Sequence, residues 1–335
     1  QGKLKLMCIY YECMQILKLL IFKIMIMKPK NLIQTAVITL LVASILFTSC
    51  RKDKEETPDP TSLSQLSKDE NEIQSNANEA INDANDILSG SSAKSTEWIP
   101  CNATVSAPDT ISNNVVWTIT YNGLNCNGKR NRQGVVKVTK QVSQLWRNQG
   151  ATISVEFINL KITKVLTGKS LTLNGIKTFI NESGGLVREL SSESASVVHS
   201  VSGSLTVLFD DNSTRQWNVS RKKTFTGIAA SNLLEVKIEG TGSANGMTQL
   251  VTWGINRNGE QFYTQILTPL ILKQSCYWDP ASGVKKHSIP DDNKSATLTF
   301  GLDSNGNTVN SSNCATHYRV DWEKNGNTGT ILFEI

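Results

Sequence analysis

The chain has 335 residues, of which 39% are hydrophobic and 19% charged, so it can build an apolar core and is not a disordered protein. The formal charge is +5, from 34 basic and 29 acidic residues. Residues 1–49 hold six of the basic residues and one of the acidic residues, so the rest of the chain has 28 of each and no net charge. Because nucleic-acid binding needs concentrated positive charge, we expect no nucleic-acid partner.

Residues 27–49 have the order of a secretory signal: a positive start at Met27, an apolar run of 16 residues from Leu32 to Phe47, and small residues. The run is shorter than the ~20 residues that a membrane-spanning helix needs. The cysteine that follows, Cys50, resembles the lipobox cysteine of bacterial lipoproteins. The resemblance implies that residues 27–49 are a lipoprotein signal peptide and that Cys50 is lipidated and anchors the chain to the membrane. An uncleaved membrane anchor is the alternative.

The segments on either side of this signal carry no folded pattern. We expect residues 1–26 to be translated sequence upstream of a true start at Met27; a second membrane helix over the apolar stretch from Ile16 to Met27 is the alternative, disfavoured by Lys18 and Lys23. Residues 50–66 are charged and contain proline, which favours a flexible tether. The mixed charges directly after Cys50 also resemble the export signal of surface-exposed lipoproteins of Bacteroidota-type outer membranes. The expected location is therefore the outer membrane and the cell surface, with a periplasm-facing protein or a plain linker as alternatives.

One helix is expected before the strands. Ser67 and Glu70 have the spacing of a capping box, and Gly90 can end the helix. Between them apolar residues recur every three or four positions: Ile73, Ala77, Ala80, Ile81, Ala84, Ile87 and Leu88. We therefore predict an acidic amphipathic helix and linker over residues 67–95. It either docks on the rest of the protein or serves as a spacer.

Residues 96–335 have the period-two pattern of β-strands. Val115, Trp117, Ile119 and Tyr121 alternate with polar or β-branched residues, and the same alternation recurs to the end of the chain. Asn-Gly, which suits tight hairpin turns, occurs seven times, and Asn258-Gly259 between two strands is the best hairpin. The sequence predicts an antiparallel all-β domain of about a dozen to sixteen strands. It leaves open a single sheet, a sandwich, a barrel, or two halves at about 96–190 and 191–335.

Four cysteines besides Cys50 lie in the exported part, and four cysteines allow three pairings. We expect the neighbouring pairs, Cys101 with Cys126 and Cys276 with Cys314, because each pair brackets one clear strand and closes a modest loop. An oxidising compartment favours disulfides. A zinc site is disfavoured because no Cys-x-x-Cys is present.

A strand, a cysteine, a turn and basic residues follow one another in Thr118–Gly123, Cys126–Arg130 and Arg132–Gly134. This segment resembles one in Bacteroidota-type lipoproteins to which no activity is assigned. The resemblance covers the leader and roughly residues 98–190. It implies a secreted, β-rich lipoprotein.

Patterns typical of catalysis are missing from the sequence. The three histidines (His199, His287 and His317) have no metal-ligand spacing, and no nucleophile elbow or dinucleotide loop is present. Asp303-Ser304-Asn305-Gly306-Asn307 begins like a calcium loop but lacks its later glycine and glutamate. We therefore expect no cofactor and no metal, and we name no catalytic residue.

Aromatic and basic residues give the candidates for ligand binding. Trp117, Trp253 and Trp322 share strand faces with apolar residues and belong to the core. Tyr277 and Trp278, directly after Cys276, are the preferred ligand-binding candidates, with a packing role for Trp278 as the alternative. Arg130 and Arg132 belong to a basic run that either meets an anionic partner or forms a solvated turn.

These features favour a lipid-anchored, non-catalytic binding or structural module at the cell surface, with a glycan or a surface protein as its partner. Two other classes stay open. A carbohydrate-active hydrolase would need two facing carboxylates in a cleft. A periplasmic lipid or lipoprotein carrier would need a deep apolar cavity.

Overall fold

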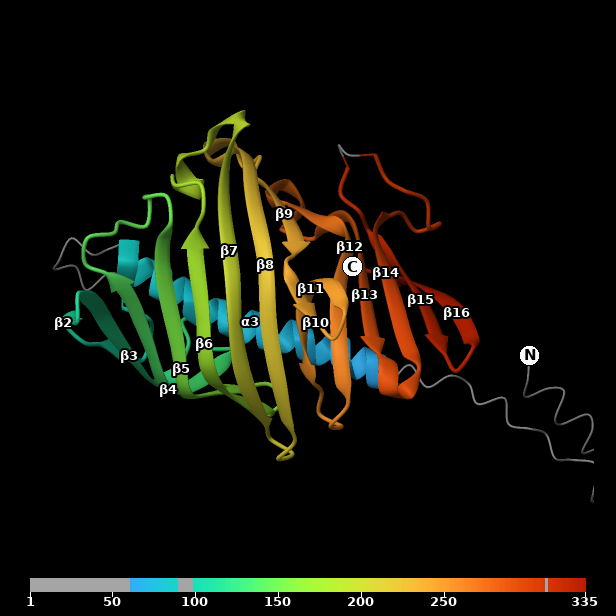
Figure 1. Ribbon diagram of the computed structural model, residues 1–335, viewed down its shortest axis with the longest axis horizontal. Helices are drawn as coiled ribbons and strands as arrows, with labels where there is room; N and C mark the ends of the chain where they lie inside the picture. Colours follow the sequence, from blue (N-terminus) through green and yellow to red (C-terminus); the bar gives the residue numbers. More distant parts are fainter. Residues whose placement is uncertain (1–60, 90–98, 311–312) are drawn as a thin grey trace, which may run out of the picture. The chain divides into compact units, whose positions relative to one another are not determined.

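The computed structural model describes residues 61–89, 99–310 and 313–335. The expected signal peptide, Cys50, most of the expected tether, Gly90 and Trp98 lie outside the described residues. The described residues form one long α-helix, α3 (Thr61–Ser89), and one antiparallel sheet of 16 strands (Figure 1). The prediction of an antiparallel all-β domain preceded by a helix is confirmed.

The sheet is built mainly from consecutive hairpins, so its strand order largely follows the sequence. Three short strands lie outside this order: β2 pairs with β3, β10 pairs with β11, and β9 pairs with both β8 and β12. The strands are β1 (Ala103–Val105), β2 (Asp109–Ile111), β3 (Asn114–Leu124), β4 (Arg130–Gln141), β5 (Ala151–Lys164), β6 (Ser170–Asn181), β7 (Ser191–Phe209), β8 (Thr214–Ile228), β9 (Glu235–Gly240), β10 (Gly242–Ala244), β11 (Met247–Ile255), β12 (Gln261–Lys273), β13 (Pro280–Ile289), β14 (Lys294–Leu302), β15 (His317–Lys324) and β16 (Asn327–Glu334).

The sheet does not divide near residue 190. β7 pairs along its length with β6 on one side and β8 on the other, so the two halves considered from the sequence are continuous. Hydrogen bonds across β7 therefore join the strands before residue 190 to those after it in one sheet.

Asn-Gly pairs serve two different purposes. Asn258-Gly259 forms the turn between β11 and β12, as predicted. Asn122-Gly123 and Asn174-Gly175 instead lie inside β3 and β6, where the hairpin interpretation was wrong. Gly175 has φ 125°, and a Cβ there would lie 2.2 Å from the carbonyl oxygen of Ser204 on β7. Glycine is required at this position by the close approach of two strands.

α3 crosses one face of the sheet from β14 to β3 (Figure 1). Its 29 residues, at a rise of about 1.5 Å each, give a length of about 43 Å. β3 and β14 are the ends of a row of ten strands, and nine spacings of about 4.8 Å also make about 43 Å. The helix therefore matches the width of the sheet that it covers.

The predicted apolar stripe of α3 is buried against the sheet. Ile73 and Ala77 are fully buried, and they share one core with Trp117, Ile119 and Phe157 from the strands. Trp253 and Trp322 are half-buried. The helix is docked rather than a free spacer.

The predicted start of the helix was wrong. α3 begins at Thr61, so Ser67 and Glu70 lie inside it and form no capping box. Glu70 instead accepts hydrogen bonds from Arg215 and from Trp217 Nε1. Buried cations on the sheet offer a carboxylate a stronger partner than a free backbone amide does.

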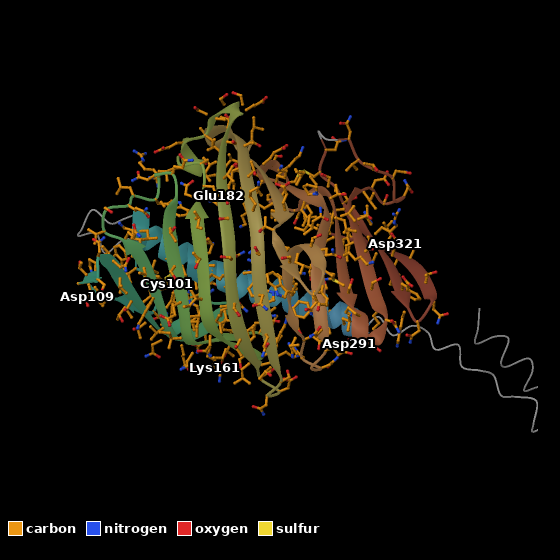
Figure 2. All side chains as sticks on the ribbon, viewed as in Figure 1. Cys101, Asp109, Lys161, Glu182, Asp291 and Asp321 are labelled. Carbon is orange, nitrogen blue, oxygen red and sulfur yellow. A yellow bond between two sulfur atoms is a disulfide. The ribbon has the colours of Figure 1, made fainter. Side chains whose placement is uncertain are left out.

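Two disulfides join the cysteines in the expected pairs. Cys101, labelled in Figure 2, is bonded to Cys126, and their Cα atoms are 5.1 Å apart. Cys276 is bonded to Cys314, with Cα atoms 5.5 Å apart. The second bridge holds the loop between β12 and β13 to the segment before β15. No helix in the described part of the chain is long and apolar enough to cross a membrane.

Candidate functional site

The loop after Cys276 presents two aromatic side chains. A short 3₁₀ turn (Gln274–Cys276) follows β12, and Tyr277 and Trp278 come before β13. Tyr277 is 92% exposed and Trp278 is 40% exposed. Large apolar rings normally gain free energy by burial. The sequence-predicted ligand candidates are thus both accessible.

The backbone that carries these rings is strained. Tyr277 has φ 57° and Trp278 has φ 68°, in the left-handed region that bulky residues rarely adopt. Such conformations cost on the order of 1–3 kcal/mol each and persist only where the surroundings impose them. The Tyr277 amide donates to the Gln274 carbonyl at 3.1 Å, and the Trp278 amide donates to the Lys273 carbonyl at 2.9 Å. Together with the adjacent disulfide, these bonds hold the backbone that carries the two rings.

Arg130 and Arg132 hold α3 rather than forming a solvated turn. Arg130 Nη1 donates to Glu79 Oε2 at 2.7 Å. Arg132 Nη1 donates to Asp83 Oδ2 at 2.6 Å, and its guanidinium lies 4.4 Å from the ring centroid of Tyr121. Arg132 is 3% exposed, so it is not accessible to a partner. The structure thus separates these two arginines from Tyr277 and Trp278.

Acidic residues of α3 pair with basic residues of the sheet from β4 to the turn between β11 and β12. The pairs are Asp69–Arg257, Glu70–Arg215, Glu72–Lys164, Glu79–Arg130 and Asp83–Arg132. Burial opposes the ionised form of Glu70, but Arg215 and the hydrogen bond from Trp217 outweigh it and lower the pKa of this carboxyl. For Asp83, burial dominates and the pKa is raised despite Arg132 and Tyr121. Period-two and helical patterns do not reveal these pairs, because each joins residues far apart in sequence.

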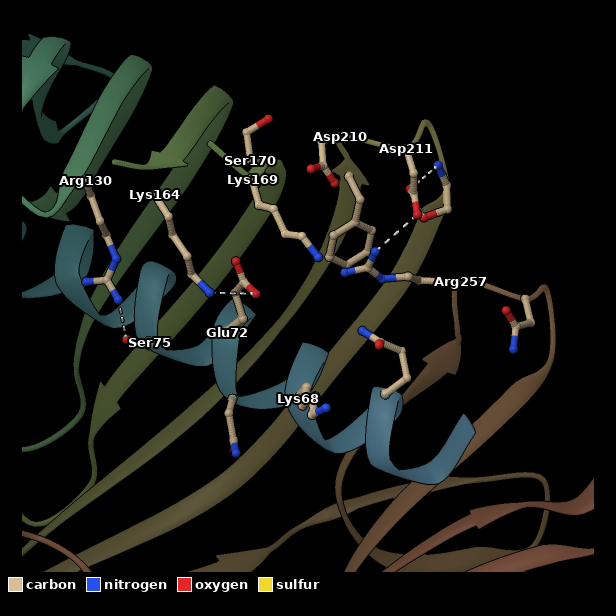
Figure 3. Close-up of a pocket in the computed structure, with 15 residues that line it drawn as sticks. Lys68, Glu72, Ser75, Arg130, Lys164, Lys169, Ser170, Asp210, Asp211 and Arg257 are labelled. Carbon is tan, nitrogen blue, oxygen red and sulfur yellow. Dashed lines mark hydrogen bonds and ion pairs between the residues drawn. The ribbon is translucent and has the colours of Figure 1, made fainter. Parts of the chain in front are cut away.

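A groove of about 1100 Å³ runs along α3 beside the turns that join β5 to β6, β7 to β8 and β11 to β12 (Figure 3). Arg257 donates to both carboxylate oxygens of Asp69 at 2.7 Å and lies over the ring of Phe209. Lys68 and Lys169 also line the groove, and within the described part of the chain neither forms an ion pair. The sequence did not single out this groove, whose lining comes from five separate segments.

The acids of this groove are arranged for ion pairing. Glu72 lies 3.0 Å from Lys164 Nζ, and hydrogen bonds from Ser213 lower the pKa of Asp211. A general acid needs the opposite shift, a raised pKa, in order to hold a proton near neutral pH.

The calcium-like segment is a capped turn, and the two cavities described beside α3 have polar linings. Asp303 Oδ1 accepts the amides of Asn305 and Asn307, which makes it the cap of a turn. Among the described residues, no three His, Cys, Asp or Glu side chains are grouped so that they could hold a metal ion. The two cavities beside α3, of about 1100 and 550 Å³, are lined mainly by polar and charged side chains.

Comparisons with known proteins give no relative for this chain. No family model, no curated protein and no solved structure matches it. The resemblance to Bacteroidota-type lipoproteins therefore stays a prediction, and functional conclusions rest on the geometry described above.

Proposed function

We propose that the protein is a non-catalytic glycan-binding module whose ligand stacks on Tyr277 and Trp278. The observation that supports this is the exposure of two consecutive aromatic side chains on left-handed backbone, 92% and 40% respectively, next to a disulfide. Exposed rings offer a flat apolar surface to the C–H face of a sugar, while the phenol and indole N–H can hydrogen-bond to its hydroxyls. Strain of this kind is typical of ligand-binding sites.

The module is further proposed to be an exported lipoprotein, held on the outer membrane and exposed at the cell surface by lipidated Cys50. The motif Thr48-Ser49-Cys50 after a short apolar run supports the anchor. Cys50→Ser is expected to abolish fatty-acid labelling and to release the protein from membranes. A Cys50→Ser protein that keeps its fatty acid and its membrane association would disprove the anchor.

Tyr277→Gly together with Trp278→Gly tests the ligand site. Glycine adopts φ values near 60° without strain, so relief of strain offsets the extra entropy of the unfolded chain. We expect the free energy of unfolding to stay within about 1 kcal/mol of the parent protein. Binding of the full chain to a glycan array should fall at least tenfold.

Phe333 provides a matched control, because it is 41% exposed and lies on β16, in another part of the sheet. Phe333→Leu should leave glycan binding unchanged. Undiminished binding by the double glycine variant, or no glycan bound by the parent protein, would overturn the proposal. Turnover of a chromogenic glycoside, lost on substitution of one carboxylate, would make the hydrolase the correct class.

A further inference from the structure

The face of the sheet beneath α3 carries more basic groups than it has acids to neutralise. Three strands supply them: Lys177 on β6; Arg215, Arg221 and Lys223 on β8; and Lys285 and His287 on β13. Lys177 is fully buried and Arg221 is 8% exposed. Glu70 is the acid of α3 that reaches this cluster, and it is occupied by Arg215 and Trp217.

Lys177 and Arg221 lack the partners that buried cations normally have. In the described part of the chain, Lys177 Nζ has no hydrogen-bond partner and neither has Arg221 Nε. Arg221 Nη2 donates to Gln74 Oε1 of α3 at 2.7 Å, which is a neutral acceptor. Burying a charged group without a counter-charge is costly, so natural sequences retain such groups mainly where they serve a purpose.

Gly203 creates the space that brings Lys177 into this cluster. Lys177, Gly203 and Val219 are neighbours in register on β6, β7 and β8. A Cβ on Gly203 would lie 2.9 Å from the Cα of Lys177 and 3.0 Å from its Cγ. With glycine here the lysine stem crosses β7, and its Nζ lies 4.5 Å from the ring centroid of Trp217 on β8. The amine therefore lies against Trp217, on the strand that also carries Arg221 and Lys223.

We propose that Lys177, Arg221 and Lys223 form an anion-binding site between the sheet and α3, and that its ligand is a phosphate group. Two amines and one guanidinium, from the two strands on either side of β7, supply the charge and the donors that a phosphate dianion requires. Burial, followed by the charges of Arg221 and Lys223, lowers the pKa of Lys177, as expected for cations gathered without their anion. Gln74, which accepts the hydrogen bond from Arg221, is itself partly exposed to solvent.

Inorganic phosphate is the first probe, titrated against the full chain at constant ionic strength with chloride as the balancing anion. We expect a saturable rise in the melting temperature and a saturable change in tryptophan fluorescence, because Lys177 contacts Trp217. Lys177→Met keeps the apolar stem and removes the charge, and it should weaken phosphate binding at least tenfold. Arg221→Met is a second variant with the same expected loss. Lys137→Met, at an exposed position on β4, should behave like the parent protein.

A phosphate group can come from a lipid or from solution, and a second titration distinguishes the two. Dihexanoyl phosphatidic acid should bind in a Lys177-dependent manner, and binding tighter than that of inorganic phosphate by tenfold or more identifies a lipid headgroup as the source. Equal affinities identify free phosphate. Responses of Lys177→Met that match the parent in both titrations would overturn the site, as would equal binding of dihexanoyl phosphatidylcholine.

Discussion

Glu70 is the residue on which the helix–sheet interface depends most directly. It joins α3 to Arg215, which is fully buried, and to Trp217 through a 3.1 Å hydrogen bond. Removing one partner of a buried ion pair leaves the other charge unpaired away from water. Glu70→Gln should therefore lower the free energy of unfolding by about 3–5 kcal/mol, measured by urea denaturation.

Glu72→Gln is the control for this prediction. Glu72 also pairs with a base of the sheet, but Lys164 is 39% exposed and solvent screens the interaction. Its loss should cost less than about 1 kcal/mol. Equal losses for Glu70→Gln and Glu72→Gln would show that burial does not determine the strength of these pairs.

Some single-residue roles could be predicted from the sequence and others could not. Cys101 and Cys126 lie only 25 residues apart in the chain, so their pairing followed from local order. Lys177 has no such signal, because its position depends on Gly203 and Trp217, which lie 26 and 40 residues away and meet it only in the folded sheet. The sequence identified Tyr277 as a ligand-binding candidate, but it did not predict the left-handed backbone conformation of this residue.

At the scale of one element, α3 depends on apolar contact as well as on ion pairs. Ile73 is fully buried in the core that α3 shares with the strands. Ile73→Ala should cost about 2–5 kcal/mol, since the sheet beneath cannot collapse into the vacated volume. Ile176 on β6 is 46% exposed, and Ile176→Ala should cost less than about 1 kcal/mol. Comparable losses in urea denaturation at the two positions would mean that α3 is not docked in solution.

The boundaries of α3 were harder to predict than its buried face. The spacing from Ile73 to Leu88 is a property of the helix itself and identified the stripe that packs. Ser67 and Glu70 also fit a capping box, but the charges of the sheet determine what Glu70 does. The Asn-Gly pairs also show that local sequence does not determine the structural role of a residue. Asn174-Gly175 has the composition of a turn but lies inside β6.

At the scale of the whole molecule, the buried bases predict an unusual response to pH. Burial, followed by Arg221, lowers the pKa of Lys223 to about 7, and burial also lowers the pKa values of Lys177 and Lys285. Between pH 7 and 10 the unfolded chain therefore binds more protons than the folded protein, so stability rises with pH. Burial lowers the pKa of His199 to about 4, which extends the same trend below pH 6.5.

The midpoint of urea denaturation should therefore increase from pH 5 to pH 9, by an amount on the order of 1 kcal/mol or more in free energy. Lys223→Met should reduce the gain between pH 7 and pH 9, because its side chain no longer binds a proton in the unfolded state. A midpoint that is flat or falls over this range would indicate that the lysines stay charged in the folded protein.

The strand pattern predicted the class of the fold but not its layers. Alternating residues such as Val115 and Trp117 show that one face of each strand is apolar, and a second sheet could cover that face as well as a helix could. What excludes a sandwich is the match between α3 and the row of strands from β3 to β14, with complementary charges along it. This match depends on the total width of many paired strands, and no short stretch of sequence contains that information.

The span of α3 also constrains how the chain can fold. Among the described residues the helix precedes every strand, yet part of its binding surface, β14, begins at Lys294, more than 200 residues after Ser89. An isolated helix rich in asparagine and serine is marginal in water, and such a long closure delays its docking. α3 should therefore consolidate last, on a nearly complete sheet. Until α3 docks, the basic side chains on this face of the sheet are not covered. The acidic segment that neutralises them is synthesised first, so α3 would act on the strands as an intramolecular chaperone does.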